Sequence, residues 1–74
     1  MAKLSARGHR EVARWATPEG ELVLVLRSDG TVLRGHRRSY GGFDYVVHGK
    51  VKPNLDPVAA VDRYAARRGM SRVV

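Results

Sequence analysis

The chain has 74 residues and no cysteine, and its 14 lysines and arginines against 7 acidic residues give a net charge of +7. A chain this short predicts one domain with a small core, because it buries only ~60% of its unfolded surface. The missing cysteines exclude disulfides and thiolate metal sites. No apolar run approaches the ~20 residues of a membrane-spanning helix, and the first ten residues lack the apolar stretch of a signal peptide. We therefore expect a cytoplasmic protein with no membrane partner, whose charge favours an anionic partner.

Residues 1–8 are interpreted as a basic lead-in and residues 9–49 as a β-meander. The segment 9–16 fits a strand by alternation, but Leu4, Gly8, Val12 and Trp15 would also share one face of a helix. The segment 17–20 has proline at its second position and glycine at its fourth, which suits a type I turn. A short turn between two extended runs favours the strand.

Asp29-Gly30 lies between two β-prone runs and predicts a hairpin over residues 22–38. With a two-residue turn, Leu26 would face Leu33 and Leu24 would face Gly35. One face of the hairpin would then be apolar and would carry Leu22, Leu24, Leu26 and Leu33. The other face would be cationic and would carry Arg34, His36 and Arg38 beside Val23, Val25 and Arg27.

Gly41-Gly42 ends this hairpin, and residues 43–48 alternate as a further strand. A helix is predicted over residues 56–68, with Asp56 as N-cap, Pro57 at the first position and Gly69 at the stop. Residues 70–74 are interpreted as a tail. The fold class is α+β, a small antiparallel β-meander of three to four strands with one C-terminal helix packed on one face. The predicted core combines strand and helix residues: Leu22, Leu24, Leu26, Leu33, Val58, Val61 and Ala65.

The sheet face without a helix is predicted to be a binding surface or a homodimer interface. Alternate cations on a strand lie ~6–7 Å apart, which suits phosphate contacts, and arginine can read guanine edges in a major groove. The alternative is a solvated face whose charges serve solubility and edge protection. The candidate nucleic-acid-binding residues are the cations of this face and its loops: Arg34, His36, Arg38, Arg27, Arg14, Lys50 and Lys52. Tyr40 is the candidate exposed aromatic residue.

Neither a metal site, a cofactor nor an enzyme activity is expected. His9, His36 and His48 lie on separate segments without the short spacing of metal ligands. Catalysis would need a nucleophile or an acid–base pair held in a pocket. A small basic ribonuclease that uses His36, Tyr45 and Arg38 is a minor alternative.

Three segments, residues 1–8, 28–34 and 49–53 followed by a helix, together resemble short uncharacterised proteins of actinobacterial phages and prophages. The resemblance implies a phage accessory protein in a bacterial cytoplasm and supplies no ligand residues. The architecture is also similar to the sheet-plus-helix DNA-binding domains of phage integrase arms and plant ethylene-response factors, whose sheet enters the major groove. If residues 9–16 were a helix, the order would instead resemble the double-stranded-RNA-binding domain.

These patterns lead to two expectations about function. The first is a protein that binds nucleic acid, with duplex DNA favoured, through the open basic face of the sheet. The second is a phage protein that binds and inhibits or redirects a host bacterial protein, with Val23, Val25 and Val32 as apolar contacts among the arginines.

Overall fold

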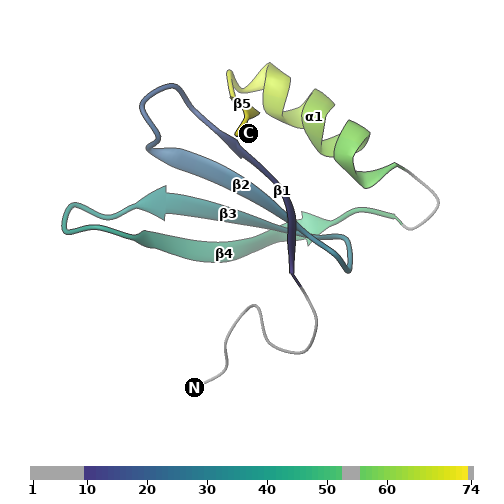
Figure 1. The fold of residues 1–74 in the computed structure, drawn as a ribbon, viewed down its shortest axis with the longest axis horizontal. Coiled ribbons are helices and arrows are strands. Elements are labelled where there is room, and N and C mark those ends of the chain that lie inside the picture. Colours follow the sequence, from purple (N-terminus) through teal and green to yellow (C-terminus); the bar gives the residue numbers. More distant parts are fainter. Residues whose placement is uncertain (1–9, 53–55, 74) are drawn as a thin grey trace.

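The computed structural model describes residues 10–52 and 56–73, which form one antiparallel sheet and one helix (Figure 1). In chain order the elements are β1 (Glu11–Ala16), β2 (Leu22–Arg27), β3 (Thr31–Arg37), β4 (Phe43–Lys50), α1 (Pro57–Arg67) and β5 (Ser71–Arg72). The strands lie in the order β4-β3-β2-β1-β5. The predicted α+β fold, a β-meander followed by a helix on one face, is confirmed.

The segment that fitted either a strand or a helix forms β1, and a tight turn follows it at the predicted position. The Gly20 amide donates to the Thr17 carbonyl at 2.9 Å, which closes a four-residue turn with Pro18 at its second position. Because β1 is a strand, the order helix, three strands, helix is wrong for the described residues. The lead-in predicted for residues 1–8 lies outside them.

The β2–β3 hairpin is confirmed, but its register differs by one residue from the predicted one. Leu24 lies opposite Arg34, and Leu26 lies opposite Val32. The Gly30 amide donates to the Arg27 carbonyl at 2.9 Å, and Gly30 has a φ of 90°. These features form a three-residue loop, a type I turn followed by a left-handed residue.

A shift of one residue turns every side chain of β3 to the other face. The predicted separation of leucines from cations is therefore wrong. Arg34 and His36 lie on the same side as Leu24, whereas Leu33 lies with Val25 on the opposite side.

The helix begins and is oriented as its sequence predicts. The Asp56 carboxylate accepts a hydrogen bond from the Ala59 amide at 3.4 Å, and Pro57 occupies the first turn. Val61 and Ala65 are buried, and Val58 is partly buried against the core. The apolar stripe of the helix therefore faces the sheet.

The helix ends in a Schellman motif that returns the chain to the sheet. The Gly69 amide donates a hydrogen bond to the Ala66 carbonyl, and the Met70 amide donates one to the Ala65 carbonyl. Gly69 itself has a φ of 70°. Met70 is buried at 5% exposure, and the next two residues pair with β1 as β5. The tail prediction is therefore wrong for Ser71 and Arg72.

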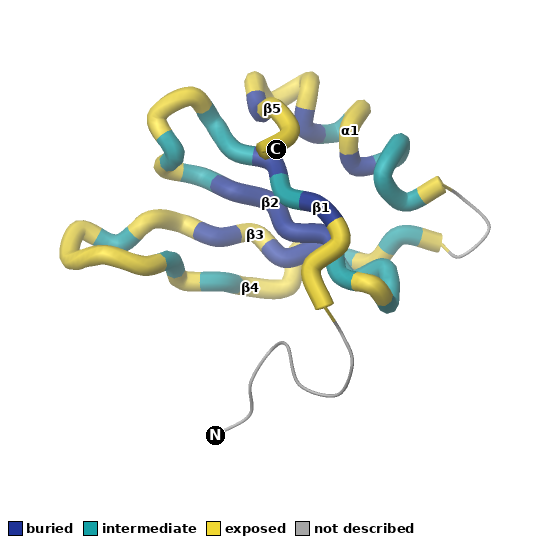
Figure 2. The backbone as a smooth tube through the Cα atoms, viewed as in Figure 1, coloured by how far each residue is buried: buried dark blue, intermediate teal, exposed yellow. Residues whose placement is uncertain are grey.

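The main core lies between α1 and the part of the sheet formed by β1 and β2. Figure 2 shows buried residues on these strands, on part of β3 and on the inner side of the helix, whereas β4 is mostly exposed. Trp15 is fully buried, and its indole N–H donates to the Asp62 carboxylate on the helix at 2.6 Å. The core cluster joins sheet and helix residues: Ala13, Trp15, Leu24, Leu26, Val32, Val61, Ala65 and Met70. Leu33 is buried as predicted, but on the other face of the sheet.

Candidate nucleic-acid interface

Arg34 and His36 stand exposed on β3, on the side of the sheet that carries the helix. Arg34 lies between Leu24 of β2 and Val46 of β4, and His36 lies opposite Asp44. The helix packs over β1, β2 and β5 and leaves the outer part of β3 and β4 open (Figure 1). The predicted sharing of one face by Arg34 and His36 follows from strand alternation and is confirmed. The prediction that this face lacks the helix is wrong.

The three cations of this stretch differ in their partners. Within the described residues, the side chains of Arg34 and His36 form neither a hydrogen bond nor an ion pair. Arg38 instead pairs with Asp44 at 3.3 Å and donates to the Phe43 carbonyl at 3.2 Å. Arg38 therefore stabilises the β3–β4 turn, whereas the guanidinium of Arg34 has no partner among the described residues.

The β3–β4 turn also carries the aromatic residue that was predicted to be exposed. Tyr40 is 82% exposed, and the Arg38 guanidinium carbon lies 5.4 Å from the centre of its ring. The turn thus presents an aromatic ring and a cation at the end of the hairpin.

The helix adds a second cation to the open region through a chain of ring contacts. The Arg68 guanidinium lies 3.9 Å from the centre of the Tyr64 ring, and this ring lies 4.9 Å from the His48 ring of β4. These residues connect the end of the helix with the outer strand. We call Arg34, His36, His48, Tyr64 and Arg68 the helix-side surface.

Sequence reasoning missed the contributions of Tyr64 and Arg68 to this surface. Neither residue is among the candidate site residues predicted from the sequence. Their meeting with His48 depends on how the helix crosses the sheet, which no local pattern encodes.

The sheet face opposite the helix is covered by long side chains of the strands themselves. The Arg14 guanidinium donates to the Tyr45 hydroxyl at 3.3 Å, although β2 and β3 separate their strands. Three strand spacings amount to ~14 Å, so the two side chains must lie across the strands between them. Beneath this Arg14–Tyr45 bridge three apolar side chains are only 3–5% exposed, namely Val23, Val25 and Leu33. Long side chains thus cover apolar surface while their polar ends stay hydrated.

Arg14 is held by a carboxylate as well as by the tyrosine. Its guanidinium donates two hydrogen bonds of 3.0 Å to the Glu11 carboxylate. These bonds raise the pKa of Arg14 and lower the pKa of Glu11, because each charge stabilises the other. Arg14 is therefore neutralised locally. Arg27 lies on the same face, and its Nε atom is buried without a hydrogen-bond partner among the described residues.

The seven predicted site residues consequently do not share one surface. Arg34, His36 and Arg38 lie on the side of the helix, whereas Arg14 and Arg27 lie on the opposite face. Lys50 ends β4 opposite Thr31, and Lys52 follows it; both lysines are exposed.

Two expectations about function relied on residues that the structure places elsewhere. Val23, Val25 and Val32 are buried, so they cannot form the apolar contacts of an interface with a host protein. The similarity to sheet-plus-helix DNA-binding domains placed the cations on the sheet face without the helix, but Arg34 and His36 lie beside the helix.

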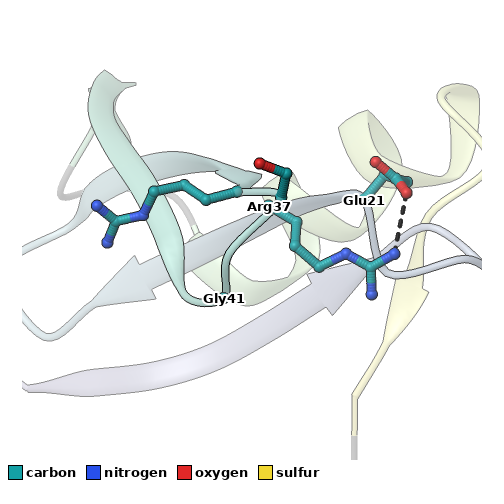
Figure 3. Close-up of a pocket in the computed structure, with 5 residues that line it drawn as sticks. Glu21, Arg37 and Gly41 are labelled. Atoms are coloured by element: carbon teal, nitrogen blue, oxygen red, sulfur yellow. Dashed lines mark hydrogen bonds and ion pairs between the residues drawn. The ribbon is translucent and has the colours of Figure 1, made fainter.

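Figure 3 shows a shallow hollow beside the β3–β4 turn, with Arg37 pointing toward Glu21. The hollow has a volume of about 500 Å³ and is lined by Glu21, Arg37, Arg38, Ser39 and Gly41. The Arg37 guanidinium forms a 2.9 Å ion pair with Glu21, so its charge is already compensated.

The residues of the ribonuclease alternative do not come together in this hollow or elsewhere. His36 lies on the helix side, whereas Tyr45, opposite Gly35, lies on the other face of the sheet. An acid–base pair needs both groups within reach of one substrate atom, which these positions do not allow.

Over residues 10–52 and 56–73, no group of three or more histidine or acidic side chains could hold a metal ion. In the same residues no helix has the length and apolarity needed to cross a membrane. Comparison with protein-family models, with curated proteins and with solved structures finds no match to this chain.

Proposed function

We propose that the protein binds nucleic acid, with duplex DNA as the favoured ligand, and that the helix-side surface contacts its phosphates. The observation that carries the proposal is the state of Arg34. This side chain is exposed on the open part of the sheet, and no described residue pairs with it. The role of a phage accessory protein in a bacterial cytoplasm belongs to the same proposal.

The charge of the whole chain supports an anionic ligand. Three arginines are paired with carboxylates in the described residues, namely Arg14, Arg37 and Arg38. The other lysines and arginines of residues 10–52 and 56–73 lack such a partner, so this part of the chain keeps an excess of unpaired positive charge. An unpaired guanidinium can bind two phosphate oxygens at once, which favours arginine for this contact.

The aromatic residue of the helix-side surface, Tyr64, favours a duplex over a single strand. Binding of single strands relies on exposed rings that stack on bases. On the helix-side surface, Tyr64 is only partly exposed, and its ring is already in contact with Arg68 and His48. Contacts with the phosphate backbone, which a duplex presents at high charge density, fit this surface better.

The test measures the affinity of the full chain for a labelled DNA duplex, an RNA duplex and a single strand between ~50 mM and ~200 mM salt. We expect the strongest binding to duplex DNA, with an affinity that falls steeply with salt. Arg34→Gln should weaken binding about tenfold and reduce the salt slope by about one phosphate contact.

Arg37→Gln is the matched control, because it removes one charge from the same strand but on the opposite face. It should change the affinity much less than Arg34→Gln. Equal losses in the two variants would mean that net charge alone acts. No binding by the unmodified chain at ~50 mM salt, where phosphate contacts are strong, would overturn the proposal.

A further inference from the structure

β4 is an outer strand of the sheet, and of the described strands only β3 pairs with it (Figure 2). At its centre Val46 is 51% exposed and Val47 is 66% exposed, one on each face of the sheet. Natural proteins protect sheet edges by short strands or by charged residues. The other edge, β5, has only two residues, whereas residues 45–47 of β4 carry no charge. The uncharged stretch 45–47 of β4, between Asp44 and the bulge at His48, is therefore an exposed edge that can pair with another strand.

The hydrogen bonds of the β3–β4 hairpin show which backbone groups of β4 are free. The Arg38 amide donates to the Gly42 carbonyl at 3.0 Å, so these two residues form a hydrogen-bonded pair. In an antiparallel ladder such pairs alternate, and Asp44 and Val46 therefore bond to β3. The N–H and C=O groups of Tyr45 and Val47 consequently point outward, away from β3.

We infer that the protein forms a homodimer in which β4 pairs antiparallel with β4 of a second copy about a two-fold axis at Val46. In this register Tyr45 lies opposite the partner subunit's Val47, and these residues exchange the free backbone hydrogen bonds. The same register sets Asp44 opposite the partner subunit's His48, which places a carboxylate beside an imidazole donor. Val46 meets the partner subunit's Val46. Opposite polar groups and apolar pairs across strands both stabilise a sheet.

Neighbouring registers match less well. An axis at Tyr45 would set the Asp44 carboxylate against the partner subunit's Val46, which dehydrates the carboxylate and offers it no hydrogen-bond donor from the partner. An axis at Val47 would set Val46 against the partner subunit's His48. His48 is the extra residue of the β4 bulge, and this register moves the bulge next to the axis, where it interrupts the ladder.

The interface is thus the edge of the sheet and not the open sheet face that the sequence suggested for a homodimer. On the face opposite the helix, the Arg14–Tyr45 bridge already covers the valines. The hydrogen-bonding match of the Asp44 carboxylate with the partner subunit's His48 imidazole, the free backbone groups of Tyr45 and Val47, and the exposed Val46 assign a second copy of the chain to this edge.

This dimer does not depend on the proposed function, but it has a consequence for it. Arg34 lies opposite Val46, so the two Arg34 residues would lie in one row across the axis. Three strand spacings separate their backbones by ~14 Å. Both copies would present the helix-side surface on the same side of a continuous sheet.

The first test is sedimentation equilibrium of the full chain without nucleic acid, from about 10 µM to about 1 mM, because pairing along one edge buries less than a standard interface. We expect the mass to rise with concentration toward twice the 8.2 kDa of the chain. Val46→Lys sets two like charges opposite each other and should weaken the dimer about tenfold or more. Val12→Lys changes a valine of β1 that is 48% exposed and should leave the dimer unchanged.

The second test checks the register, and the absence of native cysteines makes it simple. The two copies of Val46→Cys would face each other in a pair without hydrogen bonds, with Cβ atoms ~4.5–5.5 Å apart, and should form a disulfide after a small adjustment. Val47→Cys faces the partner subunit's Tyr45 and should cross-link about tenfold more slowly. A mass of 8.2 kDa at every concentration, or equal cross-linking of the two variants, would overturn the inference.

Discussion

Gly35 is the residue that allows the face opposite the helix to close. A Cβ atom at this position would lie 2.7 Å from Cε1 of Tyr45 and 2.8 Å from Cγ2 of Val23. The Tyr45 ring therefore lies directly over the backbone of β3, from where its hydroxyl reaches Arg14. Because Gly35 has no side chain, the long side chains of Tyr45 and Arg14 can cover the sheet face opposite the helix.

We expect Gly35→Ala to lower the free energy of unfolding by about 1–3 kcal/mol, because the added methyl group must displace the Tyr45 ring or the Val23 side chain. The measurement is urea unfolding followed by circular dichroism. Since the displaced ring would also move from Arg14, the apolar residues beneath the bridge should become more exposed.

Gly49→Ala is the control for this substitution. Gly49 also lies in a strand, but no atom lies within 4 Å of a Cβ built there. The substitution should change stability by no more than about 0.5 kcal/mol, as is usual at open surface positions. Equal destabilisation by the two variants would show that the general loss of glycine, and not the tyrosine contact, is responsible.

At the scale of elements, the turn after α1 directs the backbone from the helix back to the edge of the sheet. Gly69 adopts a φ of 70°, and its position lets Met70 enter the core and β5 pair with β1. The Val73 amide then donates to the Arg14 carbonyl at 2.8 Å. One left-handed residue thus connects the end of the helix to the edge of the sheet.

Gly69→Ala should destabilise the protein by about 1 kcal/mol, since a side chain is disfavoured at positive φ. We expect faster hydrogen exchange at the Val73 amide, because β5 depends on this turn. Gly41→Ala is the control, since Gly41 also has a positive φ, of 104°, but lies in the β3–β4 turn. It should lower global stability without a selective effect on Val73. Unchanged exchange at Val73 in Gly69→Ala would show that β5 forms without the turn.

The β2–β3 turn shows how far the sequence determines the sheet. Asp29-Gly30 correctly predicts a hairpin, because only a residue tolerant of positive φ fits there. The same pair suits a two-residue loop or a three-residue loop, and the Asp29 carboxylate binds the Thr31 amide at 3.0 Å in the loop observed. Local propensity does not distinguish these lengths, yet the choice sets the face of every β3 side chain.

The residues of the candidate site likewise fall into two groups: those that a local pattern predicts and those whose position depends on loop length or on helix packing. Alternation within one strand is a local property, and it correctly placed Arg34 and His36 together. Their position beside the helix depends on the loop length. The contacts of Tyr64 and Arg68 with this region depend on the packing of the helix, so they could not be predicted from spacing.

For the molecule as a whole, the excess of positive charge opposes folding, because the compact state brings like charges together. In the part of the chain that the structure describes, ion pairs act against this repulsion, among them those between Arg14 and Glu11, Arg37 and Glu21, and Arg38 and Asp44. All three involve partly or fully exposed side chains, and exposed pairs each contribute little. The net charge of +7 should therefore outweigh them.

We expect the free energy of unfolding at pH 7 to increase by roughly 0.5 kcal/mol between about 20 mM and about 200 mM NaCl, since salt screens the long-range repulsion more than it weakens close pairs. Two charge reversals at exposed positions test this cause. Arg63→Glu lowers the net charge by two and should flatten the dependence on salt, whereas Glu19→Lys raises it by two and should steepen it. A decrease of stability with salt would show that the local ion pairs outweigh the net charge, because screening lowers stability only where the interactions that it weakens are attractive.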